Sequence, residues 1–373
     1  MIYNKFCDKE ISMLGMGCMR FPVLDNGEVD FLKTEELIDL CIKEGVNYFD
    51  TAWFYHGGKS EETMGKILKK YKRESFYLAT KMPGNDFKSK DEVIALFEKQ
   101  LKDCQVEYFD FYLFHNVCED NINIFTDENL GIIDYLKEQK EKGRIKHLGF
   151  STHGSLKLIE EFIKDNRDII EFCQIQLNWL DWTLQDAKAK VELLQKYNLP
   201  IWVMEPVRGG RLAKLSDEDE KNLKDLRPEE SVPAWAFRFI QSIPDVKMVL
   251  SGMSDKNQLE DNLKTFSENK PLTDKERNII FKIADKILSK KTLACTDCKY
   301  CIEECPKKIE IPKILSLYNN MCLIKKEPDY NTVKEKTNIL PSECIGCKAC
   351  EKKCPQGIKI SEIMKDFSEQ LNC

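Results

Sequence analysis

The sequence predicts an α/β protein that begins with a TIM (β/α)8 barrel and continues into a small α-helical domain. The first observation is an alternation of short apolar strands with amphipathic helices, which fills roughly the first 260 residues. The second is a dense cysteine pattern after residue 294. We therefore expect a barrel over residues 1–270, a helical linker over 271–290 and a cysteine-rich domain over 291–373.

Eight short runs rich in apolar and aromatic residues are predicted as the barrel strands. They cover residues 11–21, 46–49, 76–80, 109–114, 145–150, 172–177, 201–204 and 247–250. Glycines in the first run suit a close approach of the backbone. Apolar residues at helical spacing predict helices over 34–43, 60–71, 90–101, 129–142, 155–164, 186–197, 232–241 and 256–266. Thr34 is the expected N-cap of the first helix. An open doubly wound sheet is the alternative, but the early GxGxxG turn of that fold is absent.

Composition narrows the class of protein. The chain has 373 residues, of which 42% are hydrophobic and 32% are charged, as in a globular protein with a sizeable core. The net charge of -6 argues against a general nucleic-acid binder. No apolar run approaches the length that spans a bilayer, and the first residues do not begin a signal peptide. We therefore expect a cytoplasmic protein that binds neither nucleic acid nor membrane.

Acid–base side chains follow three successive predicted strands. Asp50 ends the strand over 46–49, and Tyr55 lies in the loop that follows. Lys81 and His115 come directly after the next two strands. A TIM barrel brings such strand ends to one mouth. There a lysine lowers the pKa of a nearby phenol, a carboxylate holds the lysine, and a histidine orients a substrate oxygen. Each residue alone would be interpreted as a turn cap or a structural residue, but their joint placement favours catalysis.

This arrangement resembles the catalytic tetrad of the aldo-keto reductases, over about residues 1–270. The resemblance implies reversible reduction of a small carbonyl compound to an alcohol, with hydride from NADP(H) or NAD(H). Tyr55 would donate the proton, assisted by Lys81 and Asp50. His115 would position the carbonyl oxygen.

The same resemblance implies nucleotide contacts at the later strand ends. Ser151 and Gln174 would hold the nicotinamide carboxamide, and a glycine-rich turn at 209–210 would wrap the pyrophosphate. The turn at 251–254 would receive a phosphate near a helix N-terminus. The full set of candidates is Ser151, Gln174, Met204, Gly209, Gly210, Ser251, Gly252, Ser254, Lys256, Gln258 and Asn262.

Two positions depart from the family pattern. Met204 stands where an aromatic residue commonly stacks on the nicotinamide, and Gly252 stands where a basic residue often holds the 2′-phosphate. Lys256 lies close to Gly252 in sequence, so the choice between NADPH and NADH stays open. His56 and His153 follow strand ends as well, and they either line the pocket or lie in solvent-exposed loops.

Two cysteine runs with the same spacing give the strongest signal in the chain. They are Cys295-x2-Cys298-x2-Cys301-x3-Cys305-Pro306 and Cys344-x2-Cys347-x2-Cys350-x3-Cys354-Pro355. Sixteen cysteines in a small secreted protein would indicate disulfides, but two tight runs in this chain favour metal ligation. Structural zinc is the alternative, and it is usually held by two CxxC pairs.

Both runs match the bacterial ferredoxin pattern, in which three cysteines hold one 4Fe–4S cluster and the fourth ligates the other. The match implies two clusters, one on Cys295, Cys298, Cys301 and Cys354, and one on Cys344, Cys347, Cys350 and Cys305. Apolar spacing predicts helices over 311–318 and 358–367, the first with Pro312 in its first turn. The domain is therefore expected to resemble an α-helical ferredoxin.

The whole chain is identified as a member of the aldo-keto reductases that carry a C-terminal 4Fe–4S domain. We expect an NAD(P)H-dependent oxidoreductase with two clusters for electron transfer. The alternative is a redox sensor or electron-transfer protein whose barrel binds nicotinamide or flavin with little carbonyl turnover. Residues 291–373 contain 14 Lys+Arg and 12 Asp+Glu, and Lys348, Lys352 and Lys353 surround the second cysteine run. Such a surface suits an acidic ferredoxin or flavodoxin as partner.

Overall fold

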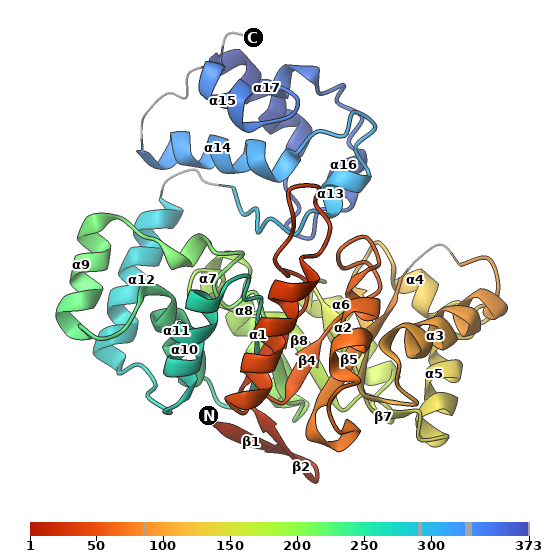
Figure 1. Ribbon diagram of the computed structural model, residues 1–373. Coiled ribbons are helices and arrows are strands. Elements are labelled where there is room, and N and C mark those ends of the chain that lie inside the picture. The colour runs from red at the N-terminus through yellow and green to blue at the C-terminus, as the bar shows by residue number, and fades with distance from the viewer. Residues whose placement is uncertain (85–86, 290–292, 325–329, 372–373) are drawn as a thin grey trace. The chain divides into compact units, whose positions relative to one another are not determined.

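The computed structural model describes residues 1–84, 87–289, 293–324 and 330–371, which form two compact units (Figure 1). The first unit comprises Met1–Val207 and Leu215–Thr273, and the second comprises Arg208–Lys214 and Asp274–Cys373. We expected one cut after residue 270 and a separate linker over 271–290. In the structure the linker helix and a loop from the barrel part of the sequence both belong to the second unit.

Eight parallel strands close into a barrel in the order β10-β3-β4-β5-β6-β7-β8-β9, which confirms the predicted TIM fold. A closed sheet has no free edge, so the open doubly wound alternative is excluded. The strands are β3 (Leu14–Gly17), β4 (Tyr48–Asp50), β5 (Tyr77–Pro83), β6 (Phe109–Val117), β7 (Ile145–Thr152), β8 (Phe172–Gln176), β9 (Ile201–Met204) and β10 (Val246–Ser251).

Helices follow the strands where the apolar spacing predicts them. The last two barrel helices coincide with the predicted ranges, and Ser231 and Asp255 cap them. The predicted cap at Thr34 is wrong, because the Asp30 side chain accepts the Lys33 N–H one turn earlier. The helices of this unit are α1 (Phe31–Lys43), α2 (Ser60–Leu68), α3 (Lys90–Cys104), α4 (Ile122–Phe125), α5 (Ile132–Glu141), α6 (Leu156–Asp165), α7 (Asp181–Leu184), α8 (Ala187–Lys196), α9 (Asp217–Leu226), α10 (Val232–Gln241) and α11 (Lys256–Phe266).

The chain enters the barrel through a hairpin that the sequence did not predict. Strands β1 (Tyr3–Phe6) and β2 (Lys9–Ser12) are antiparallel. The strand predicted over 11–21 is therefore too long, because residues 11–12 belong to this hairpin and the first barrel strand is β3 alone. The turn lacks the usual Asn-Gly or Asp-Gly signal, and Cys7 adopts the left-handed conformation there, with a φ of 52°. The Phe6 ring packs 4.9 Å from the ring of Trp202, near the amino end of β9. The hairpin thus fills that end of the barrel with an aromatic side chain.

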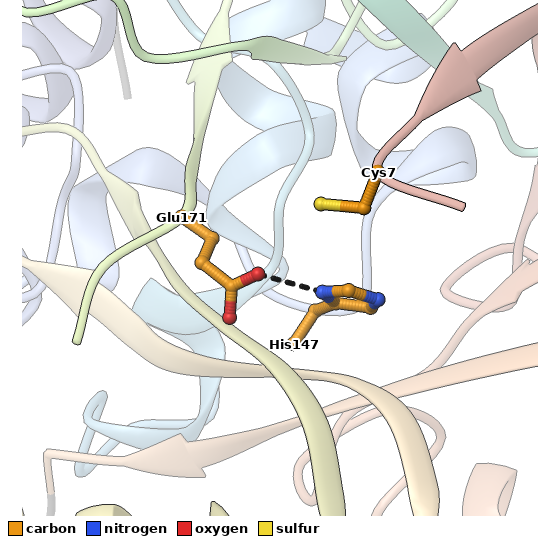
Figure 2. Close-up of side chains that lie close together, drawn as sticks. All are labelled: Cys7, His147 and Glu171. Atoms are coloured by element: carbon orange, nitrogen blue, oxygen red, sulfur yellow. Dashed lines mark hydrogen bonds and ion pairs between the residues drawn. The ribbon is translucent and has the colours of Figure 1, made fainter. Parts of the chain in front are cut away.

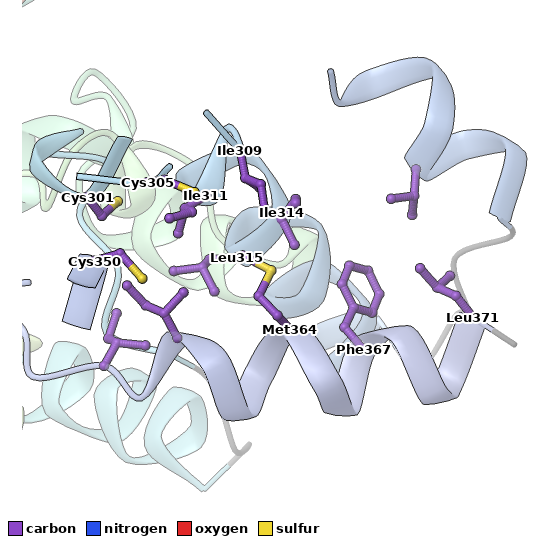
Figure 3. Packing of buried hydrophobic residues seen from close by; sticks show 13 residues of the cluster. Cys301, Cys305, Ile309, Ile311, Ile314, Leu315, Cys350, Met364, Phe367 and Leu371 are labelled. Atoms are coloured by element: carbon purple, nitrogen blue, oxygen red, sulfur yellow. The ribbon is translucent and has the colours of Figure 1, made fainter. Parts of the chain in front are cut away.

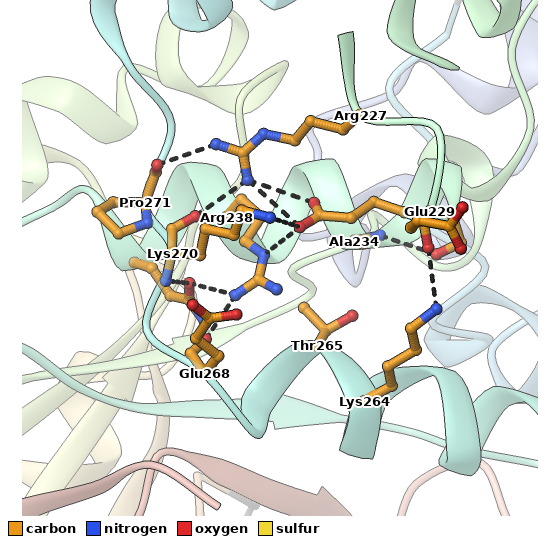
Figure 4. Close-up of polar contacts among 12 residues, drawn as sticks. Arg227, Glu229, Ala234, Arg238, Lys264, Thr265, Glu268, Lys270 and Pro271 are labelled. Atoms are coloured by element: carbon orange, nitrogen blue, oxygen red, sulfur yellow. Dashed lines mark hydrogen bonds and ion pairs between the residues drawn. The ribbon is translucent and has the colours of Figure 1, made fainter. Parts of the chain in front are cut away.

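Two buried arginines fix the segment that ends the barrel unit (Figure 4). Arg227 donates to the Lys270 carbonyl at 3.1 Å, and Arg238 donates to the Glu268 carbonyl at 2.6 Å. Both guanidinium groups also pair with the Glu230 carboxylate, at 3.4 and 3.1 Å. Charged donors make stronger hydrogen bonds than neutral ones, so this segment is held firmly without regular secondary structure.

The second unit is helical in the part of the chain that the structure describes. Its helices are α12 (Asp274–Leu288), α13 (Tyr300–Glu303), α14 (Ile311–Ile324), α15 (Tyr330–Lys336), α16 (Ala349–Lys352) and α17 (Ile360–Leu371). Ile314 and Leu315 share a buried core with Met364 and Phe367, as Figure 3 shows. Helices α14 and α17 thereby confirm the two helices predicted from apolar spacing. No helix within the described ranges is long and apolar enough to cross a bilayer.

One carboxylate is buried between the barrel and its helices. Glu61, in α2, is only 1% exposed. Its Oε1 accepts from the Thr80 hydroxyl at 2.5 Å and from the Gln100 amide at 2.8 Å. Burial raises the pKa of Glu61 to about 7, against the lowering effect of these two hydrogen bonds.

We expect the free energy of unfolding of Glu61→Gln to exceed that of the parent by an amount that grows as pH rises. The pKa of Glu61 is raised from 4.5 to about 7 in the folded state. The protonated carboxyl group therefore contributes fully to the stability of the parent below pH 4.5, and this contribution is lost as pH rises through 7. This difference in pKa between the unfolded and the folded state corresponds to about 3 kcal/mol in the free energy of unfolding. Urea unfolding at about pH 5 and about pH 8.5 measures it. All 5 tryptophans lie in the first unit, so their fluorescence reports on the barrel. A variant whose advantage does not grow with pH would contradict the prediction.

Candidate functional site

Lys81, in β5, is the centre of a hydrogen-bonded group at the carboxyl ends of the barrel strands. Its Nζ donates to Asp50 Oδ1 at 2.6 Å, to the Thr51 carbonyl at 2.7 Å and to the Tyr55 hydroxyl at 3.4 Å. The Lys81 side chain is fully buried, and that of Asp50 is 3% exposed. Three of the four predicted catalytic residues therefore meet in one group that is shielded from water.

The backbone after β4 explains how two residues five positions apart converge. Asp50 is the last residue of the strand. The Tyr55 N–H donates to the Ala52 carbonyl at 3.1 Å, and the Tyr55 carbonyl accepts the Ser60 N–H at 3.2 Å. The chain turns back as soon as the strand ends. The Tyr55 ring thereby lies with its centroid 4.9 Å from the Lys81 ammonium.

His115 joins the group from β6. Its ring lies edge-on to that of Tyr55, with 6.1 Å between the centroids. Burial lowers the pKa of His115 well below its usual value, and the charge of Lys81 lowers it further. The imidazole is therefore neutral at neutral pH, and one of its nitrogens carries a proton that it can donate.

The pKa of Tyr55 differs from our expectation. We expected Lys81 to lower it, whereas burial raises it well above its usual value and the charge of Asp50 raises it further. The expectation is wrong because the positive charge of Lys81 is already paired with Asp50, which leaves little net charge to act on the phenol. Tyr55 consequently stays protonated at neutral pH and is able to act as a proton donor.

The residues expected to hold a carboxamide lie at neighbouring strand ends. Ser151 pairs in register with Gln174, and its hydroxyl accepts the Asn116 N–H at 2.8 Å. The Gln174 amide donates to the Met204 sulfur at 3.7 Å. Gln174 Oε1 and Asn116 Oδ1 are buried and have no hydrogen-bond partner within the described ranges. Two buried amide oxygens that lack donors fit a carboxamide, whose NH2 group offers two.

The expected phosphate turn follows β10. The Ser251 hydroxyl accepts from the Asn262 amide at 3.0 Å, and the Ser254 hydroxyl donates to the Arg20 carbonyl at 2.9 Å. A Cβ at Gly252 would meet the Arg20 side chain at 3.0 Å. The stem of Arg20 therefore covers this glycine.

The start of α11 is less open to a phosphate than we expected. The Asp255 carboxylate accepts the Gln258 N–H at 2.9 Å and the Gln258 side-chain amide at 2.6 Å. A negative charge thus occupies the position that would favour an anion. The Lys256 ammonium is mostly exposed and lies 3.5 Å from Glu260.

The predicted pyrophosphate loop belongs to the second unit. The glycines at 209–210 have φ values of 64° and 90°, in the left-handed region that glycine tolerates. Arg208 donates to the Ala294 carbonyl at 2.9 Å, and Arg211 donates to the Cys295 carbonyl at 3.2 Å. The loop is therefore attached to the segment that leads into the first cysteine run, which the sequence did not indicate.

Other polar residues at the mouth were missed or misjudged. Glu205 raises the pKa of Tyr55 and Arg20 lowers it, so both act on the predicted catalytic group. Each closely follows a barrel strand, the same signal that indicated Lys81, and it could have found them. His56 has a structural contact instead, because its Nε2 accepts the Phe21 N–H at 3.1 Å.

The eight cysteines of the two runs line two cavities in the second unit. One cavity is lined by Cys295, Cys298, Cys301 and Cys354, and the other by Cys305, Cys344, Cys347 and Cys350. Each cavity thus takes three cysteines from one run and the last cysteine of the other. This is the grouping that the ferredoxin resemblance implies.

Both runs also share an unusual backbone. The residues that flank the second cysteine are left-handed in each run, with φ of 56° and 69° at Asp297 and Lys299, and 68° and 62° at Gly346 and Lys348. Such turns direct N–H groups toward one point and form anion-binding concavities. Four thiolates around an iron–sulfur cube form an anion that accepts hydrogen bonds at sulfur. The donor set and the backbone of both cavities therefore fit 4Fe–4S clusters.

The barrel and its strand-end group define the class of protein, an NAD(P)H-dependent oxidoreductase. The sequence matches the "Aldo/keto reductase family" over residues 13–285, and the chain belongs to that family. It also matches a "4Fe-4S dicluster domain" over residues 294–359, so the cysteine runs lie in a 4Fe–4S domain. Both matches confirm the resemblance drawn from the sequence.

Similar proteins support the family and the barrel fold. The uncharacterized oxidoreductase YqkF of Bacillus subtilis is 26% identical over 303 residues, which are 72% of this chain and 91% of the relative. The holo form of aldo-keto reductase AKR11C1 from Bacillus halodurans is 27% identical, with a TM-score of 0.60 over 74% of this chain and 93% of that chain. An aldo/keto reductase from Klebsiella pneumoniae, solved with NADP and acetate, is 15% identical, with a TM-score of 0.59 over 74% of this chain and 92% of that chain.

We expect Lys81→Met to destabilise the barrel by about 3–5 kcal/mol, because the Asp50 carboxylate would stay buried without its partner. The double variant Lys81→Met/Asp50→Asn should recover most of this loss. Urea unfolding followed by tryptophan fluorescence measures both. Lys66→Met is the control, since Lys66 is 53% exposed and pairs with Glu62 at the surface, and it should cost less than about 1 kcal/mol. Equal losses in the single and double variants would show that the pair is not coupled.

Proposed function

We propose that the protein reduces the carbonyl group of a small molecule to an alcohol, and catalyses the reverse oxidation, with a nicotinamide at the barrel mouth. The observation that carries the proposal is the buried network in which Lys81 contacts both Asp50 and Tyr55. Burial of an ion pair costs free energy. A protein that only bound the nucleotide would have no use for that pair, so the network favours catalysis over a purely sensing role.

Each residue of the group has a separate task. The bound nicotinamide supplies the hydride. Tyr55 donates its phenolic proton to the carbonyl oxygen, and the hydrogen bond from Lys81 stabilises the phenolate that remains. Asp50 holds the Lys81 ammonium in place. The neutral His115 donates an N–H to the same carbonyl oxygen and thereby orients the substrate.

The nicotinamide would be held by the strand ends next to this group. Gln174 and Asn116 would accept hydrogen bonds from the carboxamide NH2, and Ser151 would keep Asn116 in position. Arg20 would supply positive charge beside Gly252, where a basic residue was expected. The Klebsiella pneumoniae neighbour was solved with NADP, which supports a nicotinamide nucleotide at this fold's mouth.

The second unit would carry two 4Fe–4S clusters, one in each four-cysteine cavity, and pass single electrons between them and a partner protein. The second run is the more accessible of the two. Cys347 and the nearby Lys348, Lys352 and Lys353 are exposed, and Ile345 is 61% exposed. An acidic ferredoxin or flavodoxin would dock on these lysines and approach that cluster.

We expect Tyr55→Phe to lower kcat/KM for carbonyl reduction by about 100-fold or more, because the variant lacks the transferable proton. Nucleotide affinity, measured by fluorescence titration, should stay nearly unchanged. Tyr71→Phe is the matched control, since that phenol bonds to Asp39 at the surface, and its activity should equal that of the parent. Parent-like turnover in Tyr55→Phe would refute the assignment. If the parent itself binds the nucleotide but reduces no carbonyl compound in a broad panel, the alternative function of a redox sensor is favoured.

We expect NADPH alone to leave the cluster absorbance unchanged on the timescale of turnover, because hydride carries two electrons and a 4Fe–4S cluster accepts one. A reduced acidic ferredoxin should bleach it rapidly in anaerobic stopped-flow experiments. Lys352→Glu/Lys353→Glu should slow that reaction and reduce its dependence on salt. Lys365→Glu, at an exposed lysine of α17 outside the second cysteine run, is the control. Rapid bleaching by NADPH without added flavin, or salt-independent reduction by the carrier, would contradict the scheme.

A further inference from the structure

A second group of metal-ligating side chains lies at the opposite ends of the barrel strands from the catalytic group. Cys7 lies in the β1–β2 turn, His147 is near the start of β7, and Glu171 directly precedes β8. One ligand atom from each lies within 4.8 Å of the others. Figure 2 shows the Cys7 sulfur directed toward the His147–Glu171 pair. Residues from three separate segments thus offer a thiol, an imidazole and a carboxylate to one point.

Two of the three ligands already lie side by side. His147 Nδ1 lies 2.7 Å from Glu171 Oε2, within hydrogen-bond distance. The imidazole is also packed between aromatic rings, with its centroid 5.0 Å from that of Phe6 and 5.2 Å from that of Phe111. A ligand whose orientation is fixed by packing loses little freedom when it binds an ion.

The third ligand occupies a conformation that glycine would adopt more easily. Cys7 has a φ of 52°, in the left-handed region, where a residue with a Cβ is strained. The chain nevertheless places a thiol at this point of the turn. Cys7 is exposed, so an ion has a route to the sulfur from solvent. An accessible thiol therefore lies next to an oriented imidazole and a carboxylate.

We propose that Cys7, His147 and Glu171 bind a zinc ion, with water as the fourth ligand. Thiolate, imidazole and carboxylate are the three ligand types that zinc takes in proteins, and tetrahedral coordination needs four. The ion takes the place of the hydrogen bond between His147 and Glu171, which leaves the imidazole protonated at Nε2 alone. The Cys7 thiol loses its proton to solvent as its sulfur closes on the ion from the hairpin. The site is separate from the two cysteine cavities, because its three residues all belong to the first unit.

Lys140 sets the affinity of this site. Its ammonium forms an ion pair with Glu171 Oε1 and also donates to the Ile169 carbonyl at 3.3 Å. Oε2 remains on the side of His147, so Glu171 binds the ion through one oxygen. A positive charge beside the carboxylate weakens the binding of a cation, and its removal should strengthen it.

The bound ion has a structural effect. It links the hairpin turn to β7 and to the residue before β8, and it thereby fastens the hairpin whose Phe6 ring fills the amino end of the barrel. Zinc should therefore slow amide hydrogen exchange in residues 3–12 and raise the unfolding temperature of the barrel, without a change in the cluster absorbance.

The experiment is equilibrium dialysis of the full chain, with its clusters loaded under anaerobic conditions, against buffered zinc. Zinc and iron per chain are measured together. We expect one zinc per chain at unchanged iron content. Cys7→Gly should weaken binding at least about tenfold, and it should fold, since glycine favours the left-handed turn. His147→Gln gives an independent loss of one ligand, and Lys140→Met should tighten binding several-fold.

Asp8→Asn is the matched control. Asp8 adjoins Cys7 and pairs with Lys9 at 3.7 Å, so the change removes a negative charge but no proposed ligand. Its zinc affinity should stay within about twofold of the parent, since exposed charges act weakly across water. The proposal is overturned if Cys7→Gly and His147→Gln hold zinc as tightly as the parent, or if zinc is bound only as iron is lost.

Discussion

The arrangement of the barrel mouth depends on one buried ion pair, between Lys81 and Asp50. Neither charge has access to water, so each must satisfy the other, and the Thr51 carbonyl accepts a further hydrogen bond from the ammonium. The pair joins β4 to β5, and backbone hydrogen bonds turn the chain back within a few residues after β4. Tyr55 thereby comes to rest over the ammonium, in a position that also buries its hydroxyl and keeps it protonated.

The barrel strands carry packed aromatic residues toward their amino ends and the predicted site residues toward their carboxyl ends. On β6, the Phe111 ring packs near the amino end, and His115 stands further along toward the carboxyl end. On β8, Phe172 packs against Trp202 with 4.6 Å between centroids, whereas Gln174 lies toward the mouth. Aromatic rings fill the amino end of the barrel, and the predicted catalytic residues lie at the carboxyl end. A strand can therefore hold its predicted catalytic residue rigidly, because its other end is anchored in the core.

The second unit is built from two separate parts of the sequence. Most of it follows residue 274, but the loop 208–214 contributes two arginines that bind the carbonyls of the segment before and at Cys295. Guanidinium groups satisfy several backbone acceptors at once, so they stabilise a segment that has no helix of its own. The cysteine cavity that begins there is consequently supported by a loop that leaves the barrel directly after β9.

The sequence by itself determined the features that depend on local spacing. The spacing and length of the apolar runs predicted eight strands with their helices. The ends of the predicted strands indicated Asp50, Tyr55, Lys81 and His115 as the candidate catalytic residues. The cysteine spacing indicated a 4Fe–4S domain. Only the tertiary structure decided what depends on burial and on distances between remote segments. It set the direction of the Tyr55 pKa, since desolvation outweighs a lysine that is already paired. It also revealed the N-terminal hairpin, the loop shared with the second unit and the group around Cys7, because no sequence period records which turns come to lie together.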